Sequence, residues 1–294
     1  MIRLIGNTPT LPLETLSNER ARLLVKLEGQ NPGGSVKDRA AWGMIRDALK
    51  QGIISEGGSK RILEATSGNT GIALAMIAAR KRIPITLFMP ENATVERVKT
   101  MRAYGAEVIL TPAEKTIEYS RILAEETARE NGDFLINQFA NPNNPLFHFQ
   151  TTGPEIWRDT RGAITHFVSA MGTTGTITGT GRYLKQQNPD IRIIGAQPDE
   201  KGGIPGIRKW SPEFMPAIFD PTVVDEKITV TKEEATEMAR YLARKEGLFC
   251  GISGGGAVAA ARKLIQKLPA TEKPALILCI LPDRGERYLS SDIF

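Results

Sequence analysis

The sequence has 294 residues, of which 41% are hydrophobic and 24% charged, and its formal net charge is +5. This balance is typical of a soluble globular protein, excludes a disordered chain, and leaves room for two domains of ordinary size or one large α/β domain. The two histidines and two cysteines show no metal-ligand spacing and no histidine lies near a glycine-flanked serine, which argues against a metal site and a Ser-His-Asp triad.

Short β-branched runs alternate with helical patterns along most of the chain. The predicted strands span residues 23–27, 62–65, 85–89, 107–110, 134–137, 165–169, 191–196 and 275–281. The predicted helices span residues 38–51, 69–81, 94–104, 114–131, 174–187, 232–245 and 255–267. This alternation predicts a doubly wound α/β fold, in which helices cover both faces of mostly parallel sheets.

Three segments depart from this alternation or mark its ends. Residues 201–221 have no clean period, and we interpret them as a functional lid rather than inert filler because they carry Arg208, Lys209 and Trp210. The Asn- and Pro-rich residues 141–145 are the best candidate for a crossing between two sheets. Residues 80–82 (Arg-Lys-Arg) close an apolar helical pattern, so we read them as a helix cap rather than a nucleic-acid patch.

The first chemically informative segment is residues 31–39, Asn-Pro-Gly-Gly-Ser-Val-Lys-Asp-Arg. Two glycines precede Lys37, and a predicted helix begins at this lysine. The positive end of a helix disfavours the ammonium form of a lysine, which helps to supply a neutral amine. Neutral amines form covalent adducts with carbonyl compounds, although a lysine in such a position is most often only a solvated surface residue.

Two further loops rich in Gly, Ser and Thr each lie where a strand passes into a helix. Residues 66–71 and 171–176 present hydroxyl groups and backbone N–H groups that suit a carboxylate or a phosphate. The second loop lacks the Walker A and dinucleotide-binding patterns, so a phosphate monoester fits it best. Each loop taken alone is also compatible with a helix cap that binds no ligand.

The glycine-rich segment 250–257 contains Ser253 and precedes the last predicted helix. A serine hydroxyl is a neutral hydrogen-bond partner for a heteroaromatic nitrogen and leaves a pyridine nitrogen largely unprotonated. This favours elimination at the β-carbon. Together, the lysine and the loops predict a site for pyridoxal 5'-phosphate.

Read in order, these motifs resemble the tryptophan-synthase-β family (fold type II) of pyridoxal-phosphate enzymes, and within it the cysteine synthases of the B type. The similar segments are residues 5–9, 31–39, 64–71, 89–90, 138–139, 152–157, 172–176, 204–207, 253–255 and 283–288. The chain departs from the B type at Gly254, where a second serine is frequent, and at Pro282, where a cysteine can occur. Both departures put access of the second substrate in doubt.

The resemblance implies roles for individual residues. Lys37 would bind the cofactor covalently and act as the catalytic base, Asn69 would bind the 3′ oxygen of the ring, and Ser253 the pyridine nitrogen. The cofactor's phosphate would be held by Gly172, Thr173, Thr174, Gly175 and Thr176. The substrate α-carboxylate would be bound by Thr66, Ser67, Thr70 and Gln138, and Arg208 would contact the second substrate.

The resemblance also implies the activity and organisation of the protein. We expect L-cysteine to be made from O-acetyl-L-serine and sulfide, and S-sulfo-L-cysteine from thiosulfate. A smaller, mobile domain (38–143) would close over the substrate on a larger cofactor-binding domain (1–37 plus 144–294). An O-phosphoserine-dependent synthase or another β-eliminating enzyme of the family stays open, as does a binding module for a serine acetyltransferase tail.

We expect the protein to be cytoplasmic and, as in the family it resembles, a homodimer. We expect no nucleic-acid or membrane partner. The sequence shows no charged-then-apolar leader and no apolar run of membrane-spanning length. Cys250 and Cys279 lie in apolar surroundings, so we expect buried, inert thiols in a reducing compartment.

Overall fold

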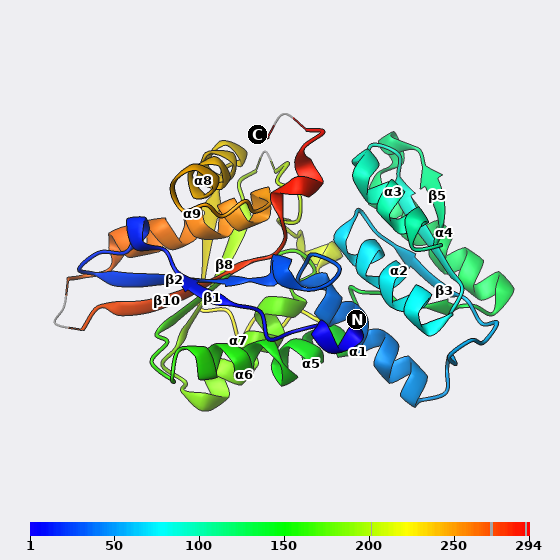
Figure 1. Cartoon of the computed structure of the whole chain (residues 1–294), viewed down its shortest axis with the longest axis horizontal. Helices are drawn as coiled ribbons and strands as arrows, with labels where there is room; N and C mark the ends of the chain where they lie inside the picture. Colours follow the sequence, from blue (N-terminus) through cyan, green and yellow to red (C-terminus); the bar gives the residue numbers. More distant parts are fainter. Residues whose placement is uncertain (201, 271–272, 292) are drawn as a thin grey trace.

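The computed structural model describes residues 1–294 except residues 201, 271, 272 and 292, and it contains two sheets that lie at opposite ends of an elongated molecule (Figure 1). The larger sheet has the strand order β1-β2-β10-β7-β8-β9, and its neighbouring strands are parallel except for the antiparallel pair β1 and β2. The smaller sheet has the order β5-β4-β3-β6 with parallel pairing. The predicted α/β fold with mostly parallel sheets is confirmed.

The bounds of the elements are as follows. The larger sheet is made of β1 (Thr10–Pro12), β2 (Ala21–Leu27), β7 (His166–Ala170), β8 (Arg192–Pro198), β9 (Glu226–Val230) and β10 (Ala275–Leu281). The smaller sheet is made of β3 (Ile62–Ala65), β4 (Ile85–Pro90), β5 (Glu107–Thr111) and β6 (Phe134–Leu135). The helices are α1 (Lys37–Lys50), α2 (Asn69–Lys81), α3 (Val95–Ala103), α4 (Thr116–Asn131), α5 (Asn143–Gln150), α6 (Thr152–Asp159), α7 (Gly175–Gln187), α8 (Lys232–Lys245) and α9 (Ile252–Lys267). Short 3-10 turns are η1 (Ile2–Leu4), η2 (Glu14–Leu16), η3 (Glu28–Gln30), η4 (Ala113–Lys115), η5 (Pro212–Phe214) and η6 (Gly285–Tyr288).

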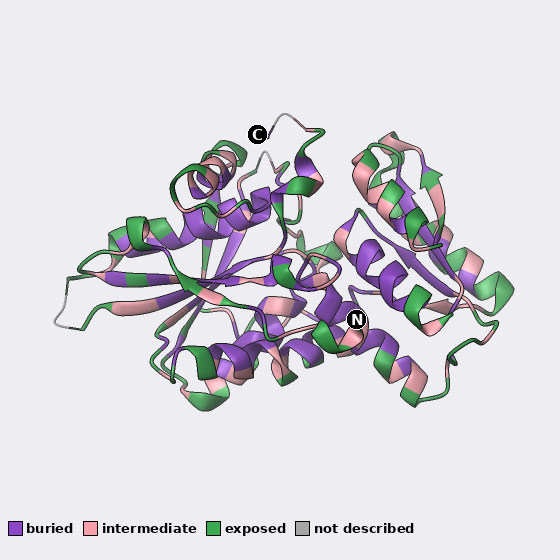
Figure 2. Ribbon diagram, in the orientation of Figure 1, coloured by how far each residue is buried: buried purple, intermediate pink, exposed green. Residues whose placement is uncertain are grey.

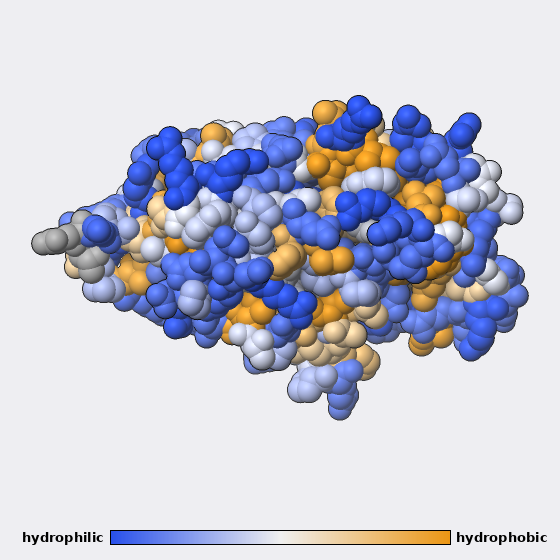
Figure 3. Space-filling view, turned by 90° about the horizontal axis from the view of Figure 1, so that it is seen from below, coloured by the Kyte–Doolittle hydropathy of each residue, from blue (hydrophilic) through white to orange (hydrophobic). Residues whose placement is uncertain are grey.

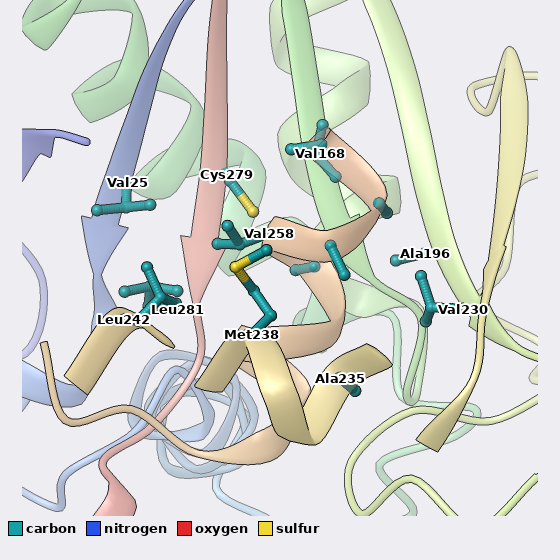
Figure 4. Close-up of a cluster of buried hydrophobic side chains, with 14 of the residues drawn as sticks. Val25, Val168, Ala196, Val230, Ala235, Met238, Leu242, Val258, Cys279 and Leu281 are labelled. Carbon is teal, nitrogen blue, oxygen red and sulfur yellow. The ribbon is translucent and has the colours of Figure 1, made fainter. Parts of the chain in front are cut away.

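The larger sheet is covered by helices on both faces, with α8 and α9 on one side and α5, α6 and α7 on the other (Figure 1). Successive residues of β10 face opposite sides, as a strand requires: Cys279 joins the core under α8 and α9, whereas Leu278 and Ile280 join the core under α6 and α7. Figure 4 shows the first of these cores, in which Met238 and Val258 pack against side chains of the sheet. The inner strands β10, β7 and β8 are buried over most of their length, as Figure 2 shows, and their sequences are mostly apolar, whereas the edge strands β1 and β9 are partly exposed.

The smaller sheet is built in the same way. Leu63 and Ala65 of β3 pack with residues of α4, whereas Ile62 belongs to the core formed with α1 and α2. After β6 the chain enters α5, which packs against α7 and α1, and it then supplies β7 to the larger sheet. The crossing predicted near residues 141–145 therefore coincides with the start of α5.

The structure also corrects several predicted elements. The edge strands β1 and β9 and the helices α5 and α6 are absent from the predicted elements. Pro145 and Pro154 weaken a helical pattern because proline lacks a backbone donor, yet each falls within the first turn of its helix, where that donor is not needed. Helix α9 begins at Ile252, three residues earlier than predicted, so the glycines after Ser253 belong to the helix.

Three smaller expectations can be checked directly. Arg80 and Lys81 lie in the last turn of α2 and Arg82 is its C-cap residue, which confirms the predicted position of residues 80–82 at a helix end. Cys250 and Cys279 are buried and free, and burial raises the pKa of the Cys250 thiol to about 12, so this thiol is inert as expected. Among the described residues, no helix is long and apolar enough to span a membrane.

Candidate active site

A cavity of about 390 Å³ lies between the two sheets, at the carboxyl ends of β3, β7 and β10. This is where open parallel sheets bind their ligands. All of the predicted site residues except Gly175 line it, namely Lys37, Thr66, Ser67, Asn69, Thr70, Gln138, Gly172, Thr173, Thr174, Thr176, Arg208 and Ser253. The chain thus brings together segments from near both of its ends.

Lys37 is the first residue of α1 and lines the cavity. Its backbone N–H donates a hydrogen bond to Ser35 Oγ (3.2 Å), which fixes the start of the helix. Burial lowers the pKa of the Lys37 amine, while the charges of Asp283 and Glu28 act in the opposite direction. A neutral, nucleophilic amine is therefore favoured at this position more than in water.

Asn69 opens α2, and its side-chain amide is held on both sides. Its Nδ2 donates to Asp283 Oδ2 (2.6 Å), and its Oδ1 accepts a hydrogen bond from Arg287. Tyr288 donates its hydroxyl to the same Asp283 oxygen (2.7 Å). An amide nitrogen carries two protons, and Asp283 is the one acceptor of Asn69 Nδ2 within the described part of the chain, so the second N–H can serve a ligand in the cavity.

The loop between β3 and α2 is held by its own hydroxyl groups. The side chain of Thr66 accepts hydrogen bonds from the backbone N–H groups of Gly68 and Gly71, both at 3.1 Å. Thr70 donates its hydroxyl to Gln138 Oε1 (2.7 Å), and both side chains are buried. Ser67 is exposed at the rim of the cavity.

The loop from Gly172 to Thr176 leads from β7 into α7. Thr174 has a left-handed backbone (φ 71°) and immediately precedes the helix, so the first N–H groups of α7 lie next to this loop. Its hydroxyl oxygen is buried and has no hydrogen-bond partner among the residues that the structure describes. Thr176 contacts His148 Nε2 (3.3 Å), which is itself buried in the layer of helices below. A helix N-terminus with an unpartnered hydroxyl suits a phosphate group.

Ser253 is buried in the first turn of α9 and lines the cavity. The backbone of Gly206 passes close to it, so that a Cβ added at Gly206 would lie 3.3 Å from the Ser253 Cβ. Gly206 has a positive φ (87°), which favours glycine at this turn. The segment 203–208 therefore forms a wall of the cavity, whereas Lys201, the first residue of the expected lid, lies outside the described residues.

Arg208 lies on that wall, 3.7 Å from Glu118 of α4 and stacked over the ring of Trp210 at 5.3 Å. The indole N–H of Trp210 donates to the Gly172 carbonyl (2.7 Å), so the segment is tied to the Gly172–Thr176 loop. Arg208 thus bridges from the larger-sheet side of the cavity to a helix of the smaller sheet.

Comparison with known proteins identifies the family. Residues 1–283 match the family model described as "Pyridoxal-phosphate dependent enzyme". The chain belongs to this family. It is 52% identical to cysteine synthase B of Pseudomonas aeruginosa and 50% identical to cysteine synthase B of Escherichia coli, with 99% of this chain covered in both cases and 95% and 94% of those proteins.

Solved structures agree with the family. Cysteine synthase from Entamoeba histolytica superposes with a TM-score of 0.92 at 38% identity, covering all of this chain and 89% of that one. O-ureido-L-serine synthase superposes with a TM-score of 0.93 at 38% identity, covering all of this chain and 94% of that one. The chain is a pyridoxal-phosphate enzyme of fold type II.

The residues in the cavity fit this cofactor. A lysine with a lowered pKa can bind its aldehyde carbon, and the unpartnered Thr174 hydroxyl at the start of α7 can bind its phosphate. The free N–H of Asn69 and the hydroxyl of Ser253 are hydrogen-bonding groups for the ring oxygen and the ring nitrogen.

Several polar residues around the site were not assigned roles from the sequence. Asp283, Arg287 and Tyr288 surround Asn69. They belong to residues 283–288, a segment that resembles the family but gives no role to these side chains from sequence. Glu64 lies directly behind Gln138, inside a strand. The sequence signal for Glu64 is a carboxylate within an otherwise apolar strand. Burying a carboxylate costs free energy unless it is hydrogen-bonded or paired, so such a residue indicates a polar network.

Proposed function

We propose that the protein is a cysteine synthase that replaces the acetate of O-acetyl-L-serine by sulfide, and that it also accepts thiosulfate to give S-sulfo-L-cysteine. The observation that carries this proposal is the meeting, in one cavity, of a helix-opening lysine, a phosphate-type loop and a hydroxyl loop from the other sheet. Relatives named cysteine synthase B, about half identical over nearly the whole chain, support the same reaction.

Each group then has a task in the reaction. When bound, the cofactor withdraws electrons from the substrate's α-carbon. Lys37 would hold the cofactor covalently in the resting enzyme. Once the substrate's amine has displaced it, its freed amine would take the α-proton as general base and return it at the end. Thr66, Ser67, Thr70 and Gln138 orient the substrate by its α-carboxylate. Ser253, a neutral partner of the ring nitrogen, limits electron withdrawal, which favours loss of acetate from the β-carbon.

The second substrate would be bound by the segment carrying Arg208. Thiosulfate is a dianion and larger than hydrosulfide, so it needs both room and positive charge near the β-carbon. Arg208 lies on the cavity wall and can supply the charge, whereas Gly33 and Gly34, which the sequence suggests as a source of room, are not among the residues that line the cavity. The arginine also suits the phosphate of O-phosphoserine, so a synthase for that substrate is the second candidate.

We further infer a smaller domain (38–143) that closes over the substrate and a larger cofactor-binding domain (1–37 plus 144–294). The position of the cavity between the two sheets supports this division. We infer a cytoplasmic homodimer. Apolar patches interrupt the polar surface on the face seen in Figure 3, as expected where a second copy docks. A complex with a serine acetyltransferase tail would be a secondary property.

Steady-state kinetics test the proposed reaction. O-acetylserine and O-phosphoserine are each paired with sulfide and with thiosulfate, using the holoenzyme. We expect the highest specificity constant with O-acetylserine and turnover with both sulfur donors. A higher specificity constant with O-phosphoserine would instead support the second candidate function, a synthase that uses O-phosphoserine. A purified protein without visible absorbance and without turnover would leave only the binding-module interpretation.

A further inference from the structure

The amide of Gln138, one of the proposed carboxylate-binding groups, has no free N–H in this structure. Its Nε2 donates to Glu64 Oε1 (3.1 Å) and to the Ala65 carbonyl (3.2 Å). Since the amide nitrogen carries two protons, both are used by protein acceptors. Gln138 can therefore bind a substrate carboxylate only by giving up one of these partners.

The hydroxyl of Thr70 is used in the same way. It has a single proton, and it donates this proton to Gln138 Oε1 at 2.7 Å. Glu64, Gln138 and Thr70 thus form a chain of hydrogen bonds that ends at the cavity, which Gln138 and Thr70 both line.

Glu64 lies in the middle of β3 and is only 2% exposed. Its contacts to Gln138 are the amide N–H and the backbone N–H (3.4 Å), and hydrogen bonding from the Asn137 backbone also acts on it. The charged group that acts on it is Arg121 of α4 on one face of the sheet, while α1 and α2 present an apolar core to the other face. Burial outweighs these contacts and raises the pKa of Glu64 to about 8.

We propose that Glu64 is a positioning residue that competes with the substrate's α-carboxylate for the Gln138 amide. In the resting enzyme Glu64 holds this amide, and binding of substrate moves an N–H of Gln138 from one carboxyl group to the other. This inference rests on the proposed function, because it assumes that an α-carboxylate binds beside Thr70 and Gln138.

Competition of this kind links substrate binding to a proton. When Gln138 turns to the substrate, Glu64 loses a hydrogen-bond donor and gains an anionic neighbour. Both changes disfavour its ionised form, so the pKa of Glu64 rises further and the enzyme takes up a proton as the carboxylate binds. The protonated form of Glu64 is then the form that binds substrate.

The test uses propionate, which carries the substrate's carboxylate and carbon skeleton but has no amine to titrate. Binding to the wild-type holoenzyme is followed by calorimetry in buffers of different ionisation enthalpy, together with inhibition of turnover. We expect proton uptake near pH 8. We expect affinity to fall about tenfold from pH 7 to pH 9, because only the fraction of enzyme with protonated Glu64 binds.

Two variants complete the experiment. Glu64→Gln keeps the shape and the acceptor oxygen but cannot ionise, so it should lose the pH dependence and bind propionate more tightly than wild type at pH 9. Glu107→Gln removes an exposed carboxylate of the same sheet and should keep the wild-type profile. If Glu64→Gln does not fold, the number of protons that the wild-type enzyme takes up on binding propionate tests the role of Glu64 by itself.

A wild-type enzyme that binds propionate without proton uptake, or a Glu64→Gln variant that keeps the full pH dependence, would overturn the role of Glu64. Either result leaves the proposed reaction standing if cysteine is still formed. Absence of cysteine formation in the wild type would instead overturn the proposed function.

Discussion

At the scale of single residues, the chemistry of Lys37 depends on where the fold places it. The lysine begins α1 and lines the cavity, and burial lowers the pKa of its amine. Asp283 opposes this effect through its charge and also binds the Asn69 amide. The same carboxylate therefore influences two of the groups proposed to hold the cofactor.

Replacing Lys37 by alanine should remove both the covalent attachment and the general base. We expect the wild type to absorb in the visible and borohydride to fix the cofactor to Lys37, as read by peptide mass mapping. The Lys37→Ala variant should lose this label, and its kcat should fall about a hundredfold or more, since general-base catalysis alone contributes about 10²–10⁴-fold. Labelling of any other lysine in the wild type would refute the assignment.

Arg208→Ala should discriminate between the sulfur donors. A charge-assisted hydrogen bond to a sulfonate oxygen is worth about 1.5–3 kcal/mol, so the specificity constant for thiosulfate should fall about tenfold or more. Hydrosulfide is small and singly charged, and its value should change little. Lys209→Ala, next in the chain and paired with Glu200, serves as the control. An equal loss with both donors would contradict donor selectivity, and a loss confined to O-phosphoserine would assign Arg208 to the first substrate.

At the scale of elements, the glycines of α9 let two helices approach closely. A Cβ added at Gly255 would lie 2.1 Å from the Ala235 carbonyl oxygen of α8, which is backbone and cannot swing aside. At Gly254 the nearest atom would be the Cys250 sulfur at 3.1 Å. The sequence Ser-Gly-Gly-Gly after Ile252 thus serves helix packing as well as the site.

Gly255→Ala should therefore destabilise the protein by about 1–3 kcal/mol, the usual cost of overpacking a close contact. Gly254→Ala, its neighbour, should cost much less, because small movements of two side chains relieve its contacts. Urea unfolding at equilibrium, followed by far-UV circular dichroism, measures both. If Gly255→Ala lost as little stability as Gly254→Ala, the result would show that α8 can shift away from α9 without cost.

The sequence predicted most of the regular elements, and the reasons for the failures are local. Segments such as α2 and β10 are recognisable from the helical period of the first and the continuous apolar run of the second. The three-residue β1 and the helices α5 and α6 carry prolines and polar residues whose role depends on partners far along the chain. The same limit hid the site network: nothing near Glu64 in sequence shows that Gln138, 74 residues later, donates to it.

At the scale of the whole molecule, a buried ionic cluster joins the segments beneath the site. Arg39 of α1 binds Glu28 and Glu155, and Lys26 of β2 binds Glu155 and Asp159. Arg39 and Glu28 are fully buried, and they connect the first turn of α1, which carries Lys37, to η3 and α6. Losing one partner of such a cluster leaves an uncompensated charge in the interior.

This cluster also predicts how stability depends on pH. Burial opposes ionisation of Glu155, but hydrogen bonds and charge from Arg39 outweigh it and lower the Glu155 pKa to about 2; the pKa of Glu28 is lowered as well. Their stabilising contribution is complete above their unfolded pKa, near 4.5, and is lost as the pH falls toward 2. His148 acts in the same direction: burial lowers its pKa to about 3, so below pH 6.5 only the unfolded chain takes up its proton.

Arg39→Met should consequently cost about 3–5 kcal/mol at pH 7, the usual loss when a buried pair is broken. Without the guanidinium, Glu28 and Glu155 resist ionisation, so the decline in stability below pH 5 should become shallower than in the wild type, leaving mainly the contribution of His148. Chemical unfolding from pH 3 to pH 7 measures both effects. Arg158→Met removes an exposed arginine paired with the adjacent Asp159, and it should leave the profile almost unchanged. If Arg39→Met instead kept the steep acid decline of the wild type, the cluster would not be the source of the pH dependence.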